Sequence, residues 1–291
     1  MSLIFKKIVA SYHKNLPFVC FNKPNATKLK AYFGEDASLR YSDSFKEEGF
    51  VFAPFHNENP SIVFLKETSE VIEELYIKNS IDTSDSEFKE YESAKNSHKA
   101  LVLAGIDAIK SNSFKKVVLS RKELVALTSF DLLQVFENLL QKYDHAFVYV
   151  WFHPKVGLWM GATPERLVTL KNKEFHTTAL ASTQNYEGNS NPIWGNKEIK
   201  EHQFVIDYIV SQIKDQQNGI ILKNFSISDT HTIKAGSLLH LKADIKGEIE
   251  EFELKNLLNT LHPTPAVCGL PRASAKSFIL NNENYDRTFY T

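Results

Sequence analysis

Residues 146–180 read AFVYVWFHPKVGLWMGATPERLVTLKNKEFHTTAL, and this stretch decides the fold. It contains four apolar segments of strand length that are joined by short turns. The four expected strands are Ala146–Phe152, Gly157–Gly161, Arg166–Leu170 and Glu174–Leu180. Parallel neighbours need a crossover of about a dozen residues or more, so these short connections predict an antiparallel meander.

The chain before this stretch divides at a polar segment. Residues 1 to about 80 carry short strand candidates between turn residues, namely Phe18–Phe21, Lys28–Phe33, Gly49–Phe52 and Ser61–Leu65. Thr83–Asn96 is the most polar and charged stretch of the chain and lacks branched aliphatic residues. We therefore expect a variable β-rich part over residues 1–90 and a second region over residues 91–291.

Longer helices alternate with strands in the second region. Apolar residues recur at helical spacing from His98 to Ile109, and the branched run within Lys115–Lys122 has the length of a strand. The other expected elements are a helix opened by Ser129 and Asp131, a helix over Lys197–Gln217, strands over Ile220–Ser226 and Leu238–Ile249, and a helix over Phe252–Leu261. Clustered strands with helices between the clusters predict an α+β fold with large antiparallel sheets covered by helices.

The composition excludes several classes of protein. Lys and Arg total 34 against 35 for Asp and Glu, and a net charge of −1 gives no electrostatic reason to bind nucleic acid or an anionic membrane. No run of 18 apolar residues occurs that could span a membrane. The two cysteines, Cys20 and Cys268, are too few for a disulfide framework and lack the spacing of a zinc site. We therefore expect the protein to reside in a reducing cytoplasm.

Common nucleotide, hydrolase and zinc signatures are absent, because no GxGxxG, Walker, GxSxG or HExxH string occurs. Two single residues have both a bland and a chemical interpretation. Lys116 is either a solvent-facing strand lysine beside Lys115 or a desolvated lysine able to act as a general base. Glu165 follows Thr163–Pro164 at a rigid corner, either as a surface carboxylate or as a general acid at the mouth of a sheet.

One expected helix begins with a cluster of polar residues. Glu198, Glu201 and His202 occupy positions i, i+3 and i+4, which share one face. The cluster is either a charged first turn that complements the helix dipole or a site for Mg²⁺, which binds one or two carboxylates and completes its shell with water and substrate oxygens. His240 in a strand and His262 before a proline-rich loop predict no site by themselves.

Seven strings, in this order, resemble those of the chorismate-binding enzymes, which include isochorismate synthase, salicylate synthase and the large chains of anthranilate and aminodeoxychorismate synthase. They are KVVLSR at Lys116–Arg121, GATPERL at Gly161–Leu167, TALAST at Thr178–Thr183, KEIKEH at Lys197–His202, LHL at Leu239–Leu241 with Gly247, HPTPAVCG at His262–Gly269 and YDRTFY at Tyr285–Tyr290. The resemblance implies the fold of these enzymes, in which large antiparallel sheets pack as a sandwich with helices outside.

The resemblance also implies roles for single residues. In isochorismate-forming members, the lysine matching Lys116 activates a water that attacks C2 of chorismate, and the glutamate matching Glu165 protonates the departing C4 hydroxyl. Mg²⁺ binds the ring carboxylate of the substrate; the glutamate matching Glu201 holds it directly, and the one matching Glu198 holds it through water. The expected substrate-binding residues are Thr178, Leu180, Ala181, Ser182, Thr183, His240, Thr264, Ala266 and Val267.

Two features depart from the family pattern. Ser182 stands where the family usually has glycine, at a point where the backbone comes near the ligand. The family also continues beyond the position of Thr291, with a strand bearing a second direct Mg²⁺ glutamate and strands with a carboxylate-binding arginine. We therefore expect a chain that is truncated and lacks the usual C-terminal strands, so that its own activity is an open question.

The resemblance predicts an Mg²⁺-dependent isochorismate synthase, an isomerase that serves menaquinone or siderophore biosynthesis. Lys116 distinguishes this activity from that of the ammonia-using relatives, which generally carry glutamine at this position and need a glutamine amidotransferase. We expect a cytoplasmic monomer that acts on chorismate, without an amidotransferase, nucleic-acid or membrane partner. The alternatives are salicylate synthase, then aminodeoxychorismate or anthranilate synthase component I, and a non-catalytic chorismate-binding remnant.

Overall fold

The computed structural model describes residues 2–77 and 92–291, and the fold is α+β, as predicted. Every strand pair within those residues is antiparallel. The chain forms two compact units, each discontinuous in sequence. Unit 1 contains the described residues of Met1–Ala53, Glu58–Asp85 and Leu127–Glu165, and unit 2 contains those of Pro54–Asn57, Ser86–Ala126 and Arg166–Thr291.

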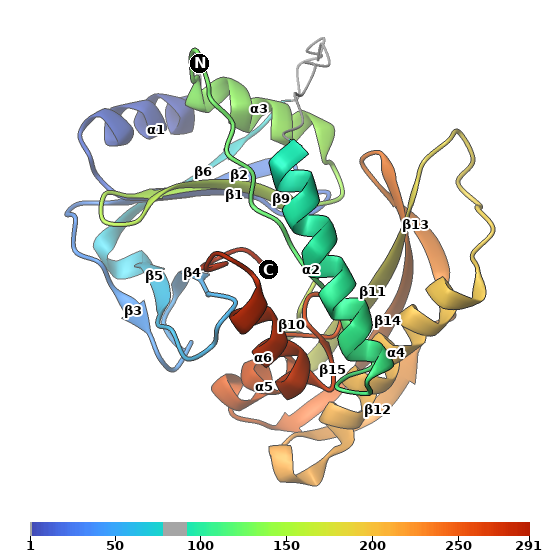
Figure 1. Cartoon of the computed structure of the whole chain (residues 1–291). Coiled ribbons are helices and arrows are strands. Elements are labelled where there is room, and N and C mark those ends of the chain that lie inside the picture. Colours follow the sequence, from blue (N-terminus) through green and yellow to red (C-terminus); the bar gives the residue numbers. More distant parts are fainter. Residues whose placement is uncertain (1, 78–91) are drawn as a thin grey trace. The chain divides into compact units, whose positions relative to one another are not determined.

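A five-stranded sheet in the order β6-β2-β1-β8-β9 organises unit 1. Its strands are β1 (Phe18–Asn22), β2 (Lys28–Gly34), β6 (Ser69–Leu75), β8 (Phe147–His153) and β9 (Gly157–Thr163). Helices α1 (Leu3–His13) and α3 (Leu132–Lys142) cover one face of this sheet (Figure 1). Ile4, Ile8 and Phe136 are fully buried between the helices and the sheet, and their burial stabilises this layer.

Unit 1 also contains a three-stranded sheet with an aromatic core. Its strands run in the order β3 (Tyr41–Ser42), β5 (Ser61–Leu65) and β4 (Gly49–Phe52), and a 3₁₀ turn over Lys66–Thr68 follows β5. Phe52 packs against Trp151 of β8 with ring centroids 4.8 Å apart, and Phe21 stacks on Phe50 at 5.3 Å. The ranges predicted for β4 and β5 are confirmed.

A second large sheet organises unit 2. It runs in the order β10 (Thr169–Lys171), β11 (Glu174–Asn185), β14 (Leu238–Glu251) and β12 (Ile221–Ile227), and β13 (His231–Ala235) also pairs with β14. Helix α4 (Asn196–Lys214) packs on one face of the sheet and α5 (Leu254–Leu261) packs with it (Figure 1). Their common core contains Ala179, Val205, Ile209 and Ala243, and a 3₁₀ turn over Gln216–Asn218 follows α4.

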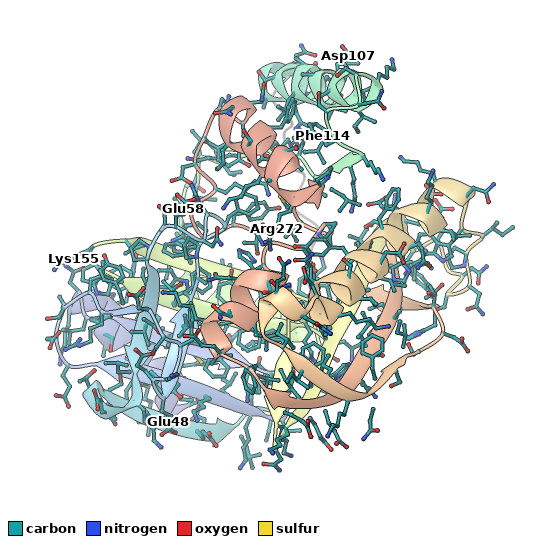
Figure 2. The ribbon with its side chains drawn as sticks, turned by 90° about the horizontal axis from the view of Figure 1, so that it is seen from below. Glu48, Glu58, Asp107, Phe114, Lys155 and Arg272 are labelled. Carbon is teal, nitrogen blue, oxygen red and sulfur yellow. The ribbon has the colours of Figure 1, made fainter. Side chains whose placement is uncertain are left out.

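A short two-stranded pair in unit 2 carries Lys116. Strand β7 (Lys116–Val117) pairs with β15 (Gly269–Leu270), and helices α2 (Glu92–Lys110) and α6 (Arg272–Asn282) lie beside them (Figure 1). Phe114, labelled in Figure 2, packs edge-on against Phe278 of α6 at 5.1 Å. Within the described residues, none of the helices is long and apolar enough to cross a bilayer.

Three expectations need correction or completion. The strand expected over Lys115–Lys122 is limited to β7, because the facing backbone is a strand only over Gly269–Leu270. Beyond Val117 the facing residues before Cys268 form a turn and offer no further strand for pairing. The meander is interrupted after β9, since β9 and β10 belong to different sheets and Arg166–Val168 is not in a strand. Most of the polar segment Thr83–Asn96 lies outside the described residues, although its end is helical.

The sequence patterns do not predict helices α1 and α6 or strands β3, β6 and β13. Helix α1 has local signals nevertheless, because the Ser2 hydroxyl accepts a hydrogen bond from Phe5 N at 3.1 Å as an N-cap. Its apolar face is short and is interrupted by Lys6 and Lys7, which weakens the periodic pattern.

Candidate active site

Lys116 is buried in unit 2, with 10% of its side chain exposed. Its Nζ donates a hydrogen bond to the carbonyl oxygen of Pro265 at 2.6 Å and lies 3.2 Å from Oε1 of Glu201. A lysine is rarely buried to this degree without such partners. The structure therefore excludes the solvent-facing interpretation of Lys116 and places its ammonium between a backbone carbonyl and a carboxylate.

Helix α4 supplies the two carboxylates expected to bind a metal. Glu201 faces Lys116 and keeps 32% of its side chain exposed. Glu198 lies in the first turn, and its carboxylate folds over the N-cap residue Gly195, where an added Cβ would come within 2.6 Å of Oε2. No side chain caps α4, so the Glu198 carboxylate and the helix dipole complement each other at this end.

His202 does not join these carboxylates. It is buried toward the sheet, and its Nε2 donates to the carbonyl oxygen of Ala179 at 3.1 Å. Burial lowers the pKa of His202, and the hydrogen bond to Ala179 opposes this shift only in part. Of the three residues on the expected face, only the two glutamates are available for chemistry at the start of α4.

Ser182 lies at an irregularity of β11. The pairing with β14 shifts register between Ala181 and Thr183, and Ser182 has a φ of 63°, in the left-handed region. A residue other than glycine is strained there by roughly 1–2 kcal/mol. The Ser182 hydroxyl donates to the carbonyl oxygen of Glu198 at 2.7 Å, so the side chain absent from glycine connects the bulge to the first turn of α4.

His240 faces the same bulge from β14. Its Nδ1 lies 3.2 Å from the carbonyl oxygen of Ser182 and 3.1 Å from the hydroxyl of Thr183. Because a carbonyl only accepts, Nδ1 carries the proton and Nε2 is the acceptor of the neutral ring. Burial lowers the pKa of His240, which keeps this ring neutral near pH 7.

These contacts connect much of the predicted site within unit 2. His240 contacts Ser182, Ser182 contacts the Glu198 carbonyl, and one turn further along α4 Glu201 contacts Lys116. Lys116 in turn contacts Pro265, which lies between the predicted substrate-binding residues Thr264 and Ala266. Residues far apart in the sequence are thus brought together by the bulge, the start of α4, β7 and the loop before β15.

The loop before β15 is folded around Thr264. The Thr264 carbonyl accepts from Val267 N at 3.2 Å and from Cys268 N at 3.0 Å, and its hydroxyl accepts from Ala266 N at 3.3 Å. A cavity of about 400 Å³ borders this loop. It is lined by His98, Val118, Leu119, Ser120, Arg121, Ala266, Val267, Arg287, Tyr290 and Thr291. Two predicted substrate-binding residues, Ala266 and Val267, therefore line a hollow next to the Lys116 strand.

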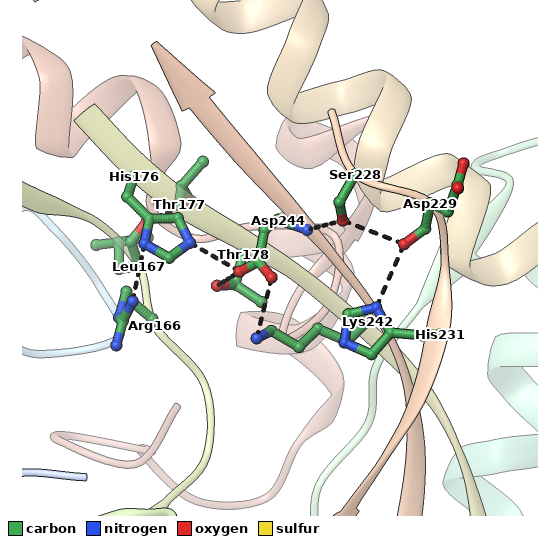
Figure 3. A network of polar contacts seen from close by, with 10 residues as sticks. All are labelled: Arg166, Leu167, His176, Thr177, Thr178, Ser228, Asp229, His231, Lys242 and Asp244. Atoms are coloured by element: carbon green, nitrogen blue, oxygen red, sulfur yellow. Dashed lines mark hydrogen bonds and ion pairs between the residues drawn. The ribbon is translucent and has the colours of Figure 1, made fainter. Parts of the chain in front are cut away.

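The remaining predicted residues of β11 lie on its two faces. Ala181 packs in the core beneath α4, whereas Thr178 and Leu180 alternate onto the opposite face. There Thr178 joins a polar network with His176, Lys242 and Asp244 (Figure 3). Burial alone would raise the pKa of Asp244, but hydrogen bonds from His176 at 2.7 Å and Lys242 at 3.2 Å outweigh it and lower that pKa. The Thr178 hydroxyl is thus directed toward Asp244.

Glu165 belongs to the other unit. It is the last residue of unit 1, and its backbone N–H donates to the Thr163 hydroxyl at 3.3 Å across Pro164. The rigid corner expected at Pro164 is therefore present as the point where the chain leaves unit 1. The role of Glu165 as a general acid stays a prediction.

The donor set at the start of α4 is compatible with Mg²⁺. Glu198 and Glu201 are both partly exposed carboxylates on successive turns, and oxygen ligands of this kind suit a hard cation. Within residues 2–77 and 92–291, no group of three or more His, Cys, Asp or Glu side chains converges as a metal site. The chain would therefore supply two carboxylates and leave the other positions to water and substrate oxygens.

Two groups near Lys116 are not predicted from the sequence. The Pro265 carbonyl is a backbone atom, so residue type gives no signal for it. The buried pair of Glu283 and Arg287 adjoins the same strand, and only its spacing of four residues could have indicated a pair.

The family model for chorismate binding enzymes matches residues 55–291. The chain belongs to the chorismate-binding enzyme family. The matched range includes Lys116, Glu201, His240 and the loop before β15, and the predicted resemblance is confirmed.

Curated relatives support the same family. A salicylate biosynthesis isochorismate synthase of Pseudomonas aeruginosa is 29% identical over 201 residues, covering 66% of this chain and 41% of that protein. An isochorismate synthase of Haemophilus influenzae is 28% identical over 195 residues, covering 62% of this chain and 44% of that protein. The chain thus spans about half the length of the curated relatives it matches.

Solved structures show the same fold. A Bacillus anthracis protein described as a 2,3-dihydroxybenzoate-specific isochorismate synthase superposes with a TM-score of 0.75 at 21% identity, covering 98% of this chain and 83% of that one. The menaquinone-specific isochorismate synthase of Escherichia coli superposes with a TM-score of 0.68 at 15% identity, covering 94% of this chain and 74% of that one. The chorismate-utilising fold predicted from the sequence strings is therefore confirmed.

Proposed function

We propose that this chain is an isochorismate synthase, which adds water at C2 of chorismate and expels the C4 hydroxyl. The observation that carries the proposal is the buried Lys116, whose Nζ lies between Glu201 and the Pro265 carbonyl. An amine can take a proton from water, whereas the amide of a glutamine cannot. The names of the matched relatives, which are isochorismate synthases, favour the same reaction.

Lys116 is proposed as the general base. In the free chain its ammonium is paired with Glu201 at 3.2 Å, and a carboxylate at this distance stabilises the charged form. General-base catalysis needs the free amine, so this ion pair must be broken or discharged during the cycle. The neutral His240 ring presents Nε2 as a hydrogen-bond acceptor and is suited to orient a hydroxyl of the substrate.

Glu201 and Glu198 would hold Mg²⁺, Glu201 directly and Glu198 through water. The ion supplies positive charge for a substrate carboxylate when it is bound. Glu165 is proposed as the acid that protonates the leaving C4 hydroxyl, and the loop around Thr264 would form one wall of the substrate site.

Incubation of the purified chain with chorismate and MgCl₂, followed by chromatographic separation of the products, tests the proposal. Isochorismate is the expected product. Salicylate would support the salicylate synthase alternative, which the link of one relative to salicylate biosynthesis favours. Unchanged chorismate at all Mg²⁺ concentrations would contradict the proposal for this chain and support a non-catalytic role. A menaquinone-specific and a vibriobactin-specific isochorismate synthase are both matched, so the proposal covers either use of the product, in menaquinone or in siderophore biosynthesis.

A further inference from the structure

Arg287 lies behind the strand that carries Lys116. Its side chain is only 4% exposed, and its guanidinium makes two hydrogen bonds to backbone carbonyls. Nη2 donates to the carbonyl oxygen of Val118 at 2.8 Å, and Nη1 donates to that of Val267 at 3.2 Å. One planar group thus connects two segments that are separate in sequence.

Each of the two carbonyls lies a short distance along the chain from a group of the proposed site, one from Lys116 and the other from Pro265. Val118 follows Lys116 by two residues, and Val267 follows Pro265 by two residues. The same two segments are joined on the other side of Lys116 by the pairing of β7 with β15, in which Lys115 N donates to Leu270 O at 2.6 Å. The spacing of Lys116 from the Pro265 carbonyl is therefore fixed on one side by a ladder of two residues, and on the other by Arg287 together with the backbone bond from Val118 N to Cys268 O at 2.7 Å.

The guanidinium is itself held rigidly. Glu283 accepts from Nε at 2.7 Å and from Nη2 at 2.6 Å, and the Glu283 carboxylate also accepts from the backbone N–H and the hydroxyl of Ser120 at 2.8 and 2.9 Å. The Phe55 ring lies 4.3 Å from the guanidinium carbon. Replacing a buried ion pair by apolar residues is often neutral for stability. What this pair supplies is geometry, because a bidentate fork fixes orientation in a way that a point charge does not.

We propose that Arg287, oriented by Glu283, is a positioning residue that holds Lys116 against the Pro265 carbonyl and Glu201. The proposal concerns the placement of the Lys116 amine, and its consequence for turnover rests on the proposed function. If the fork is lost, the segments carrying Lys116 and Pro265 keep the pairing of β7 with β15 and the backbone bond from Val118 N to Cys268 O at 2.7 Å, but they lose the two side-chain bonds to Val118 O and Val267 O. The amine then gains mobility and access to solvent.

Reductive methylation of the full-length chain under native conditions tests the placement directly. The labelling rate of Lys116, measured by peptide mass spectrometry, is divided by that of the exposed Lys197 in the same sample. In Arg287→Met the ratio is expected to rise at least tenfold. Arg287→Lys keeps the charge opposite Glu283 but cannot span both carbonyls, so the ratio is expected to rise here too, even if the Met variant does not fold.

Arg272 provides a matched control, since its guanidinium donates to the carbonyls of Asn259, Thr260 and His262 in the same unit, and none of these acceptors belongs to the Lys116 strand. Arg272→Lys should leave the ratio within twofold. An unchanged ratio in both Arg287 variants, or an equal rise in Arg272→Lys, would overturn the proposal.

Turnover provides the second readout. If the wild-type chain forms isochorismate, Arg287→Lys should lower kcat at least tenfold with KM for chorismate within threefold, because none of the residues assigned to substrate binding is changed. A rise in KM with kcat unchanged would overturn a positioning role. Absence of turnover in the wild-type chain would contradict the proposed function and leave the labelling result to decide on Arg287.

Discussion

Unit 1 and unit 2 bury different kinds of side chain. The core of unit 1 is built from aliphatic and aromatic residues such as Phe18, Phe136 and Trp151, and charged side chains such as Glu48 and Lys155 stay at its surface (Figure 2). Unit 2 buries Lys116, His202, Glu283 and Arg287 in addition to its apolar core. Among the described residues of unit 1, the buried polar side chains are Asn22, Ser42, Ser61 and His153.

This difference indicates where most of the proposed catalytic groups lie, Glu165 at the end of unit 1 being the exception. Burial of a charge is costly unless the charge is paired and hydrogen-bonded, and an apolar core of the same size would be at least as stable. Unit 2 nevertheless holds an ammonium, a carboxylate and a guanidinium below its surface, each with a named partner. Such groups cluster at functional sites, whereas the core of unit 1 has the composition of a stabilising scaffold.

The largest effect is expected from Lys116→Gln. This change removes the only proton acceptor proposed for water and should lower kcat by about 10²–10⁴-fold while chorismate binding is kept, because Lys116 is assigned to water activation and not to anchoring. Initial rates and binding by calorimetry check both halves of the expectation. Near-normal turnover in the variant would remove Lys116 from the mechanism and, with it, the functional contrast between the units.

A core substitution in unit 1 should lower stability and leave turnover per folded molecule nearly unchanged, which is the opposite of the effect expected for Lys116→Gln. Phe136 is fully buried, so Phe136→Ala should lower the free energy of unfolding by about 3–5 kcal/mol. Turnover per folded molecule should stay within twofold, as judged from urea unfolding and from rates at low temperature. Val135→Ala on the same helix, at a position with 39% exposure, is the control and should cost much less. A selective loss of kcat in Phe136→Ala would show that unit 1 is more than a scaffold.

The two carboxylates of α4 should differ in their effect on Mg²⁺. Glu201→Gln removes a proposed direct ligand and should weaken Mg²⁺ by about 10–100-fold, whereas Glu198→Gln should weaken it only a few-fold. Titration of activity with MgCl₂ in each variant measures the shift. Equal shifts would mean that the inner and outer roles are assigned incorrectly.

Acid should lower the stability of unit 2, and this effect should be smaller than those of the substitutions above. Burial lowers the pKa of His202 and of His262 from the usual 6.5, so the unfolded chain binds more protons than the folded chain below that value. The stability that these two groups contribute is complete above about pH 6.5 and is lost as the pH falls from there toward their lowered pKa values.

His262→Gln isolates one of these contributions. Urea unfolding at pH 7.5 and pH 5.5, followed by Trp194 fluorescence in a chain without the other two tryptophans, should show a smaller acid loss for this variant than for its parent. An identical loss in both would exclude His262 as a source of acid sensitivity.

The sequence predicts the positions of single strands better than it predicts which strands share a sheet. Strands β4 and β5 have the predicted bounds because each is a short continuous apolar run, FVF in β4 and IVFL in β5, of strand length and not of helix length. The meander prediction is wrong between β9 and β10, since short connections indicate antiparallel neighbours but cannot indicate that a corner at Pro164 takes the chain into another sheet. Local spacing contains no information about such long-range assignments.

In the candidate site, too, the sequence predicts single residues but not the backbone atoms that they contact. Ordered strings select Lys116, Glu201 and His240, and the structure joins them through the bulge and the start of α4. Of the two partners of Lys116, the strings select Glu201 but not the Pro265 carbonyl, because a backbone carbonyl is common to all residue types. The contacts of Arg287 with Val118 O and Val267 O are likewise to backbone atoms, for which residue type gives no signal. The Ser182 hydroxyl also has a partner, Glu198 O, which only the three-dimensional structure reveals.

The most direct test of the central claim, that unit 2 uses Lys116 to direct water onto chorismate, is a reaction in water enriched in oxygen-18 with MgCl₂ and an ammonium salt present. Isochorismate carrying one oxygen-18 is predicted, together with the absence of any aminated product and the loss of labelled product in Lys116→Gln. Unlabelled product, labelled product formed equally well by Lys116→Gln, or the appearance of aminodeoxychorismate or anthranilate would contradict the claim.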